Sequence, residues 1–443
     1  MTTIGTEPVR MAPGTITEST HPEGMPAGEG GHGVSALERR LLIWLLDGMG
    51  NPPVQFVLWN GEEVAVSTRK PLHRILIRNR AALRHFLVNP ELHFGDEYAA
   101  GRIEVEGDLV ECLEDVYRSM ARAPSSVSLR HDLLDWLHRP SANSLAAARE
   151  NIHHHYDLGN DFYQLWLDRN LVYTCAYFAT GKVTLEEAQI AKMDLVCRKL
   201  RLTPGETVVE AGCGWGALAL HMARHYGVRV DAYNISREQL AFARERVHAE
   251  GLAGRVEFIE DDYRNIRGEY DVFVSVGMLE HVGLDHYIEF GRVMHNCLTE
   301  SGRGLIHTIG RNRSMPLNAW VERRIFPGGH PPTLREMMDV FEPQNFSVLD
   351  VENLRLHYAE TVGHWLARFD AVRDFIEAKH GTEFARAWRL YLAGSKAAFS
   401  TGAMQLYQVV FANHANNDLP RTRAHQLDTE DSWVPKEWNL VTS

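Results

Sequence analysis

Short apolar runs alternate with amphipathic stretches of helical period through the second half of the chain. The apolar runs predict strands at residues 207–211, 229–234, 256–259, 272–276 and 304–309. The stretches between them predict helices at residues 216–226, 237–250 and 285–298. Such a succession predicts an α/β domain with a mostly parallel sheet and helices on both faces.

A different pattern precedes this domain. Strand-like runs at residues 54–58 and 63–67 flank Asn60-Gly61, which is a strong hairpin signal. The pattern continues with a strand at residues 74–78 and helices at residues 81–89 and 109–122. We therefore predict a small α+β domain over residues 36–140, preceded by a disordered tail at 1–35 and followed by a linker that begins near residue 139.

The first predicted helix, residues 36–49, carries apolar side chains at helical spacing, namely Leu37, Leu41, Leu42, Trp44 and Leu45. Two interpretations stay open, because periodicity does not separate them. The helix packs within its own domain, which we favour, or it lies on a membrane surface.

The α/β domain is predicted to span residues 141–415, with a C-terminal tail at 416–443. Residues 311–400 are mainly helical, apart from a strand at 347–351, and a last strand follows at 404–412. We expect this helical insertion to form a lid at the carboxyl end of the sheet, where ligands bind in such folds.

The composition of the chain disfavours or excludes several classes of protein. The chain has 443 residues, a formal net charge of −12 and five cysteines. The negative charge disfavours nucleic-acid binding, and the longest apolar runs are far shorter than the ~20 residues that span a bilayer. We detect neither a signal peptide nor a CxxC pair, so we expect a reducing cytoplasm and no structural zinc site.

A glycine-rich turn follows the first strand of the α/β domain. Residues 208–216 read Val-Val-Glu-Ala-Gly-Cys-Gly-Trp-Gly, with Glu210 ending the strand and Gly212, Gly214 and Gly216 in the turn. The spacing is not that of a dinucleotide fingerprint, and no lysine follows to hold phosphates. Because Glu210 can pair with an ammonium group, these features suit S-adenosylmethionine better than NAD.

Polar residues follow the next two strands. Asn234 and Gln239 can hydrogen-bond ribose hydroxyls, with Ser236 beside them, and one carboxylate of Asp261 or Asp262 can bind an adenine amino group. Alternatively, Asn234 and Ser236 only cap a helix.

The chain resembles the cyclopropane-fatty-acyl-phospholipid synthases, relatives of the mycolic acid cyclopropane synthases. The resemblance rests on HHYDLGNDFY at 154–163, YTCAYF at 173–178, GCGWG at 212–216, SVGMLEHVG at 275–283, IHTIG at 306–310, IFPGG at 325–329 and HY at 357–358. Residues 95–98 and 104–108 resemble the N-terminal domain of the phospholipid-acting branch.

The resemblance implies a class I S-adenosylmethionine-dependent methyltransferase fold, Rossmann-like with a seven-stranded sheet. It implies addition of the methyl carbon of S-adenosylmethionine to a cis double bond of an unsaturated phospholipid, with bicarbonate as the base. The implied bicarbonate ligands are Cys175, Glu280, His307, the backbone of Ile309, and Tyr358. Tyr173 and Thr174 would contact the cofactor, and Tyr173 and Tyr358 could stabilise a carbocation.

Each implied ligand also has a plain structural alternative. Cys175 could be a small buried side chain, and His307 a hydrogen-bonded core histidine. A related enzyme that makes methyl- or methylene-branched chains would need the same pocket, and a non-catalytic cofactor-binding scaffold would need none of these ligands. The run His153 to His155 resembles a metal tract, but without a second ligand cluster we expect no metal, and we assign His154 and Tyr156 to the entrance of the site.

The resemblance also implies a homodimer, in which the N-terminal domain packs on the catalytic domain of the partner, and peripheral contact with the inner face of the membrane. A basic and aromatic cluster in the insertion could make that contact: Arg311, Arg313, Arg323, Arg324, Arg335, Trp320, Ile325 and Phe326. Solvated faces and internal ion pairs explain the same residues equally well.

Overall fold

The computed structural model describes residues 34–65, 71–123 and 159–427. The predicted linker lies outside these residues, as do nearly all of the N-terminal tail and most of the C-terminal one. His154 and Tyr156 also lie outside them.

The N-terminal domain is built on a four-stranded sheet with strand order β2-β1-β3-β4. Its elements are α1 (Ala36–Gly48), β1 (Val54–Leu58), β2 (Glu63–Val64), β3 (His73–Ile77), α2 (Arg80–Val88), α3 (Pro90–Ala99), β4 (Ile103–Glu106) and α4 (Leu109–Arg122). The predicted hairpin around Asn60-Gly61 is confirmed, because β1 and β2 pair antiparallel with Phe56 opposite Val64. The sequence did not predict α3 or β4.

The catalytic domain contains a seven-stranded sheet with strand order β10-β11-β9-β8-β5-β6-β7. Its strands are β5 (Thr207–Ala211), β6 (Arg229–Asn234), β7 (Val256–Glu260), β8 (Tyr270–Val276), β9 (Leu298–Gly310), β10 (Ser347–Asn353) and β11 (Gln405–Ala412). Strands β5 to β9 pair parallel, whereas β11 pairs antiparallel with both β9 and β10. The parallel α/β sheet that the sequence pattern predicts is confirmed, as is the seven-stranded methyltransferase fold that the resemblance implies.

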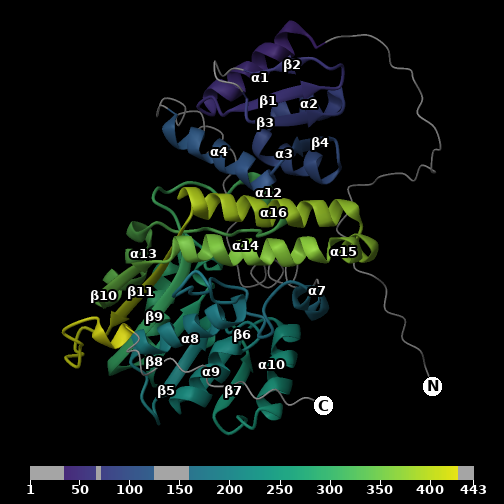
Figure 1. Ribbon diagram of the computed structural model, residues 1–443. Coiled ribbons are helices and arrows are strands. Elements are labelled where there is room, and N and C mark those ends of the chain that lie inside the picture. The colour runs from purple at the N-terminus through teal and green to yellow at the C-terminus, as the bar shows by residue number, and fades with distance from the viewer. Residues whose placement is uncertain (1–33, 66–70, 124–158, 428–443) are drawn as a thin grey trace, which may run out of the picture.

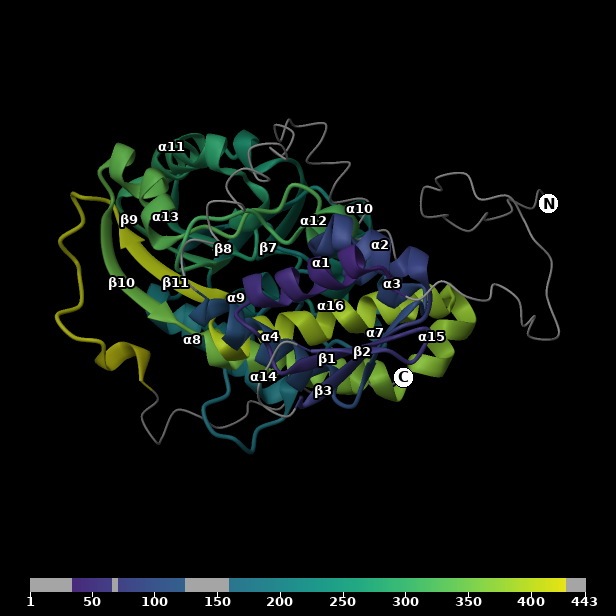
Figure 2. The same ribbon diagram turned by 90° about the horizontal axis from the view of Figure 1, so that it is seen from above.

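Alternating residues of the central strands pack on opposite faces of the sheet, as the two-residue period of a strand requires. Val208 packs with α8 (Leu185–Leu200), α9 (Ala217–Tyr226) and α10 (Arg237–Ala249). Its neighbour Val209 packs with α11 (Tyr287–Cys297) and α13 (Leu334–Phe341) on the other face. Figure 2 shows the two helical layers on either side of the sheet. Both faces are therefore covered.

The insertion separates the sheet from the N-terminal domain (Figure 1). Its remaining helices are α12 (Ala319–Arg324), α14 (Arg355–Ala371), α15 (Arg373–His380) and α16 (Thr382–Thr401). Helix α16 contacts α3 and α4, and Arg386 donates a hydrogen bond of 2.7 Å to the carbonyl oxygen of Tyr98. The N-terminal domain thus packs on helices of its own chain.

The predicted basic and aromatic cluster is not one continuous surface, so the alternative of internal contacts is correct for much of it. Arg311 is buried and donates to the carbonyl oxygen of Met315, and Trp320 and Ile325 are buried as well. Arg324 forms an ion pair of 3.0 Å with Asp96 of the N-terminal domain. Trp320 lies against Gly95 in the contact between the domains, whereas Phe326 packs on His281 and Tyr391 within the catalytic domain.

Helix α1 has one buried face and one exposed face. Leu42 and Leu46 are buried in the core of the N-terminal domain, whereas the side chains of Leu37 and Trp44 are exposed. Packing within its own domain is therefore correct for one face, and contact of the other with a membrane stays a prediction. None of the helices in the described segments is long and apolar enough to cross a bilayer.

Candidate active site

The glycine-rich turn has the backbone that its sequence predicts. Gly212, Gly214 and Gly216 have φ of 83°, 55° and 80°, in the left-handed region that favours glycine. A Cβ atom at Gly216 would lie 2.5 Å from the ring of Phe258, and one at Gly212 would lie 3.0 Å from the Cβ atom of Met278. The turn therefore needs glycine both for its conformation and for its close packing.

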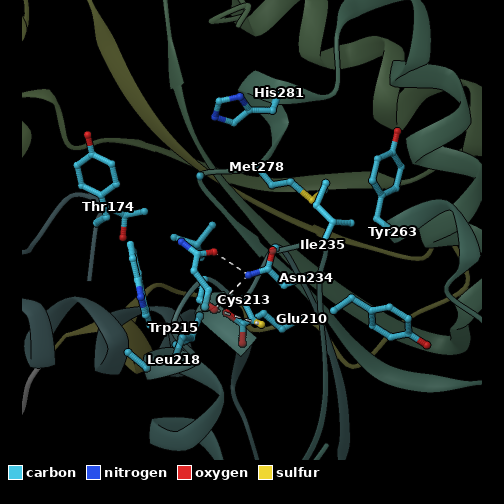
Figure 3. A pocket seen from close by; sticks show the side chains of 18 of the residues that line it. Thr174, Glu210, Cys213, Trp215, Leu218, Asn234, Ile235, Tyr263, Met278 and His281 are labelled. Atoms are coloured by element: carbon cyan, nitrogen blue, oxygen red, sulfur yellow. Dashed lines mark hydrogen bonds between the residues drawn. The ribbon is translucent and has the colours of Figure 1, made fainter. Parts of the chain in front are cut away.

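A cavity opens above this turn, at the carboxyl ends of β5, β6, β7 and β8. Most of the predicted cofactor residues line it: Tyr173, Thr174, Glu210, Gly212, Gly214, Asn234, Gln239, Asp261 and Asp262. Figure 3 shows Thr174 and Trp215 on one side of the cavity and Tyr263 on the other. Gly216 and Ser236 do not line it; they begin α9 and α10 as N-caps. The capping alternative is therefore correct for Ser236.

The polar residues after β6 hold one another in place. The side-chain amide of Asn234 donates to Gln239 at 2.8 Å and to the carbonyl oxygen of Gly214 at 3.2 Å (Figure 3). After β7, the carboxylate of Asp261 accepts hydrogen bonds from the backbone of Asp262 at 2.8 Å and from Asn265 at 2.7 Å. These contacts fix polar groups along one wall of the cavity.

Glu210 and Lys192 are two buried ionisable groups in the floor of the cavity. Burial raises the pKa of Glu210 to about 8, and Lys192 opposes that rise. Burial also lowers the pKa of Lys192 to about 8, against the attraction of Cys175, Asp168 and Glu210. The Oε2 atom of Glu210 has no hydrogen-bond partner among the residues described. This oxygen is therefore available to a cationic ligand.

Sequence analysis missed Lys192. Its Nζ donates to the hydroxyl of Thr174 at 3.1 Å. A lysine in an amphipathic helix ordinarily faces solvent. The signal that could have found it is its spacing from Ala188 and Leu195 on the buried face of α8.

Glu280 lies on the far side of the segment that closes the cavity. Met278 and His281 face the cavity, whereas Glu280 turns toward β9, where its Oε1 accepts the backbone N–H of Ile309 at 2.6 Å. The resemblance implies that this N–H contacts a bound anion. In this structure it donates its hydrogen bond to Glu280 instead. Burial raises the pKa of Glu280 to about 7, and its Oε2 finds no partner within the described part of the chain.

His307 lies two residues before Ile309 on β9 and is fully buried. Its Nδ1 lies 3.1 Å from the side-chain amide nitrogen of Gln408, and its Nε2 has no partner among the described side chains. Burial lowers the pKa of His307 well below its ordinary value. The ring is therefore neutral, with one polar nitrogen unsatisfied.

Cys175 and Tyr358 belong to the hydrophobic cluster that packs against Ile309. The Cys175 thiol donates to the carbonyl oxygen of Ala176 at 3.1 Å and lies 3.8 Å from that of Leu354. The backbone N–H of Leu354 in turn donates to Leu406, the residue paired with Ile309 across β11 and β9. Burial raises the pKa of the Cys175 thiol, which stays protonated.

Aromatic rings surround this region. Trp365 lies 5.3 Å from Tyr173 and 5.9 Å from Tyr358, between ring centroids. The hydroxyl of Tyr173 lies 2.8 Å from that of Tyr391, which joins α16 to the cavity wall. Glu280, His307 and Ile309 thus lie at the carboxyl end of β9, outside the lining of the cavity, whereas Cys175 and Tyr358 belong to the buried aromatic cluster that packs beside Ile309.

The residues described contain no group of three or more His, Cys, Asp or Glu side chains arranged to hold a metal ion.

The comparison with protein families matches residues 143–409 to the family described as mycolic acid cyclopropane synthetase. Residues 42–126, in the N-terminal domain, match a domain family of unknown function.

Two curated relatives match over most of their length. A probable fatty acid methyltransferase of Pseudomonas putida is 34% identical over 383 residues, which cover 84% of this chain and 95% of the relative. The cyclopropane-fatty-acyl-phospholipid synthase of Escherichia coli K12 is 35% identical over 351 residues, covering 78% of this chain and 89% of the relative.

Among solved structures, the mycolic acid cyclopropane synthase CmaA1, in complex with SAH and CTAB, matches with a TM-score of 0.57 and 31% identity. The match covers 60% of this chain and 98% of CmaA1.

Proposed function

Because the chain belongs to the mycolic acid cyclopropane synthetase family, whose members are S-adenosylmethionine-dependent enzymes, we propose that it makes cyclopropane fatty acids. The proposed substrate is the cis double bond of an unsaturated acyl chain in a membrane phospholipid. The proposed product carries the methyl carbon of S-adenosylmethionine as the third corner of a ring.

The pair of buried atoms at the end of β9 supports this proposal above other observations. Glu280 Oε2 and His307 Nε2 are both buried without partners in the described structure. Burying unpaired polar atoms costs free energy, and two such atoms beside the cofactor cavity support a ligand that supplies the missing contacts there. Simple transfer of a methyl group to a heteroatom needs no such pair beside the cofactor cavity.

The residues of the cavity fit S-adenosylmethionine. The unpaired Oε2 of Glu210 would accept a hydrogen bond from the ammonium of the ligand. Asn234 and Gln239 would contact ribose hydroxyls, and Asp261 or Asp262 the adenine amino group. When bound, S-adenosylmethionine supplies an electrophilic methyl group.

The residues around β9 fit a small oxyanion such as bicarbonate, which would supply the base. The Nε2–H of His307 would donate to it, and Glu280 would accept the proton of its hydroxyl group. Tyr358 and the Cys175 thiol would border the same space, and Ile309 would contribute by orienting Glu280.

The surrounding rings would keep water out of the reaction. With S-adenosylmethionine bound, the alkene would take its methyl carbon as the carbon–sulfur bond breaks, and S-adenosylhomocysteine would leave behind a carbocation on the acyl chain. Aromatic faces such as those of Tyr173 and Tyr358 would stabilise the cation. They would also exclude the water that would otherwise capture it. The proposed bicarbonate would take a proton from the transferred methyl group, and the electron pair of that carbon–hydrogen bond would form the last bond of the ring.

A second candidate function is the formation of methyl- or methylene-branched chains from the same carbocation. A relative named as a probable fatty acid methyltransferase, 34% identical to this chain, favours it. A non-catalytic scaffold is disfavoured, because it would not need the buried pair of Glu280 and His307. The proposal further places the enzyme in the cytoplasm as a homodimer at the inner face of the membrane.

The decisive experiment combines purified protein, S-adenosylmethionine and vesicles of unsaturated phospholipid. The released fatty acids are analysed by mass spectrometry and proton NMR. A product heavier by one CH₂, with upfield ring protons and no alkene signal, supports cyclopropanation. The same mass with terminal-methylene signals supports branching, and no product with cofactor bound would contradict both.

A further inference from the structure

A row of polar side chains crosses three neighbouring strands at one edge of the large sheet. Glu352 of β10 is paired with Gln408 of β11, which is paired with His307 of β9. Residues directly opposite one another on paired strands point to the same face of a sheet. The three side chains therefore form one line that leads from the edge of the sheet to His307.

Lys199 of α8 lies over this line and joins its members. Its Nζ lies 2.5 Å from Glu352 Oε2 and 2.6 Å from Gln408 Oε1. The Nε2 of Gln408 lies 3.1 Å from His307 Nδ1. Lys199, Gln408 and His307 are buried, whereas the side chain of Glu352 is 40% exposed. The line thus begins at the surface and ends inside the site.

The chemistry of these groups fixes the direction of every hydrogen bond. An ammonium group only donates, so the atom of Gln408 that faces Lys199 must be its oxygen. The amide nitrogen of Gln408 then faces His307, and since that NH₂ group only donates, Nδ1 of the ring must accept. A neutral imidazole with an accepting Nδ1 carries its proton on Nε2.

Glu352, at the exposed end of the line, favours the same tautomer of His307. The carboxylate of Glu352 favours the charged form of Lys199, against burial, which lowers the pKa of this lysine. Without that charge, the amide of Gln408 could turn over and offer its oxygen to His307. Glu352 therefore acts through Lys199.

We propose that Lys199 and Gln408 are positioning residues that hold His307 in the tautomer with its proton on Nε2, so that this unpaired N–H can donate to a small anion. The role of the anion rests on the proposed function; the tautomer itself does not. With the other tautomer, a lone pair on Nε2 would face the anion and repel it.

Gln408→Glu separates this role from a merely structural one. Glutamate has nearly the shape of glutamine and can still pair with Lys199, but its carboxylate accepts a hydrogen bond from Nδ1–H. The expected result is a reversed tautomer, with Nε2 an acceptor. Lys199→Met provides a second variant, in which the amide of Gln408 loses the group that orients it.

The test reads the ring nitrogens directly by NMR of protein labelled with ¹⁵N-histidine. The signals of His307 are identified by their loss in His307→Asn. In the unmutated protein without bicarbonate or lipid, Nε2 should be protonated and Nδ1 not. A proton on Nδ1 would overturn the proposal, whether or not lipid product is ever found.

The variants then test the consequence. Gln408→Glu should exchange the two nitrogen signals and lower turnover at least about tenfold, as loss of an outer-shell partner typically does. It should also raise the bicarbonate concentration needed for half-maximal rate, with affinity for S-adenosylhomocysteine unchanged. Gln164→Glu, at an exposed position, is the charge-matched control. Unchanged turnover and bicarbonate dependence in Gln408→Glu would refute the positioning role.

Discussion

The carboxylate of Glu280 is held at one oxygen and unsatisfied at the other. Its Oε1 accepts the backbone N–H of Ile309 at 2.6 Å, and its Oε2 is buried without a partner in the described residues. The bond to Ile309 fixes the direction of the side chain, so the second oxygen has a defined position. An acid that is oriented but unpaired in a dry region is a strong candidate for a catalytic role.

Glu280→Gln should keep the fold and the affinity for S-adenosylhomocysteine but lose turnover by about 100-fold or more. The amide oxygen can still accept from Ile309, whereas the NH₂ group cannot accept a proton from a bound anion. Isothermal titration calorimetry measures the affinity, and the vesicle assay measures turnover. Glu257→Gln, at an exposed position on β7, is the control. Unchanged turnover in Glu280→Gln would remove Glu280 from the mechanism.

The same variant should change how stability depends on pH. The folded protein keeps the proton of Glu280 up to a pKa of about 7, whereas the unfolded chain releases it near the ordinary value of 4.5. Between these values the unfolded state binds fewer protons, so the free energy of unfolding falls as pH rises, by about 3 kcal/mol in total. Glutamine does not titrate, so the free energy of unfolding of Glu280→Gln does not fall for this reason.

Urea denaturation of both proteins in bicarbonate-free buffer, at about pH 5 and about pH 7.5, measures the difference. The stability of Glu280→Gln relative to the unmutated protein should increase over this interval. A difference that does not change with pH would mean that Glu280 ionises in the folded protein as an ordinary carboxylate.

The alternating pattern of the α/β domain was sufficient to predict its fold. Strands β5 and β6 have the bounds that were predicted from the sequence, because each is a short apolar run between a turn and a helix. Strand β4 was missed, since Ile103–Glu106 alternates with two glutamates and is too short for a clear pattern. Its pairing with β3, including Arg74 opposite Glu106, is a long-range contact that local sequence does not contain.

The sequence predicted the part of the candidate site that a motif marks. It did not predict the part that consists of buried charged side chains. The cavity lining includes Glu210, Gly212 and Asn234, all found from the turn and the strand ends. Lys192 and Lys199 were missed because a lysine in a helix is ordinarily solvated, and only three-dimensional packing shows both to be buried. Likewise, no sequence pattern reveals that the N–H of Ile309 is bonded to Glu280.

Cofactor binding should release a proton from Glu210 near neutral pH. Its pKa of about 8 means that the free site holds a protonated carboxyl group at pH 7, whereas pairing with the ammonium of S-adenosylhomocysteine requires the carboxylate. Calorimetry in buffers of different ionisation enthalpy counts the protons released. Glu210→Gln should bind roughly ten times more weakly or worse and lose this contribution. Equal proton release in both proteins would assign the titration to another group, with Lys192 the nearest candidate.

Gly95 marks the closest approach between the N-terminal domain and the insertion. A Cβ atom built on Gly95 of α3 would lie 2.4 Å from the indole ring of Trp320 on α12. Alanine ordinarily stabilises a helix by up to about 1 kcal/mol relative to glycine. Here overpacking should reverse the sign and destabilise the protein by about 1–3 kcal/mol, because the ring is buried and has no room to move.

Thermal and urea unfolding of Gly95→Ala measure this effect, and Gly394→Ala is the matched control. Gly394 also lies within a helix, α16, but a Cβ atom there would meet nothing within 4 Å. The control should therefore be stabilised by the intrinsic preference of alanine, opposite in sign to Gly95→Ala. If Gly95→Ala were stabilised to the same extent, the N-terminal domain would not rest on Trp320 as described. The opposite signs would instead support close packing of Gly95 on Trp320 in solution.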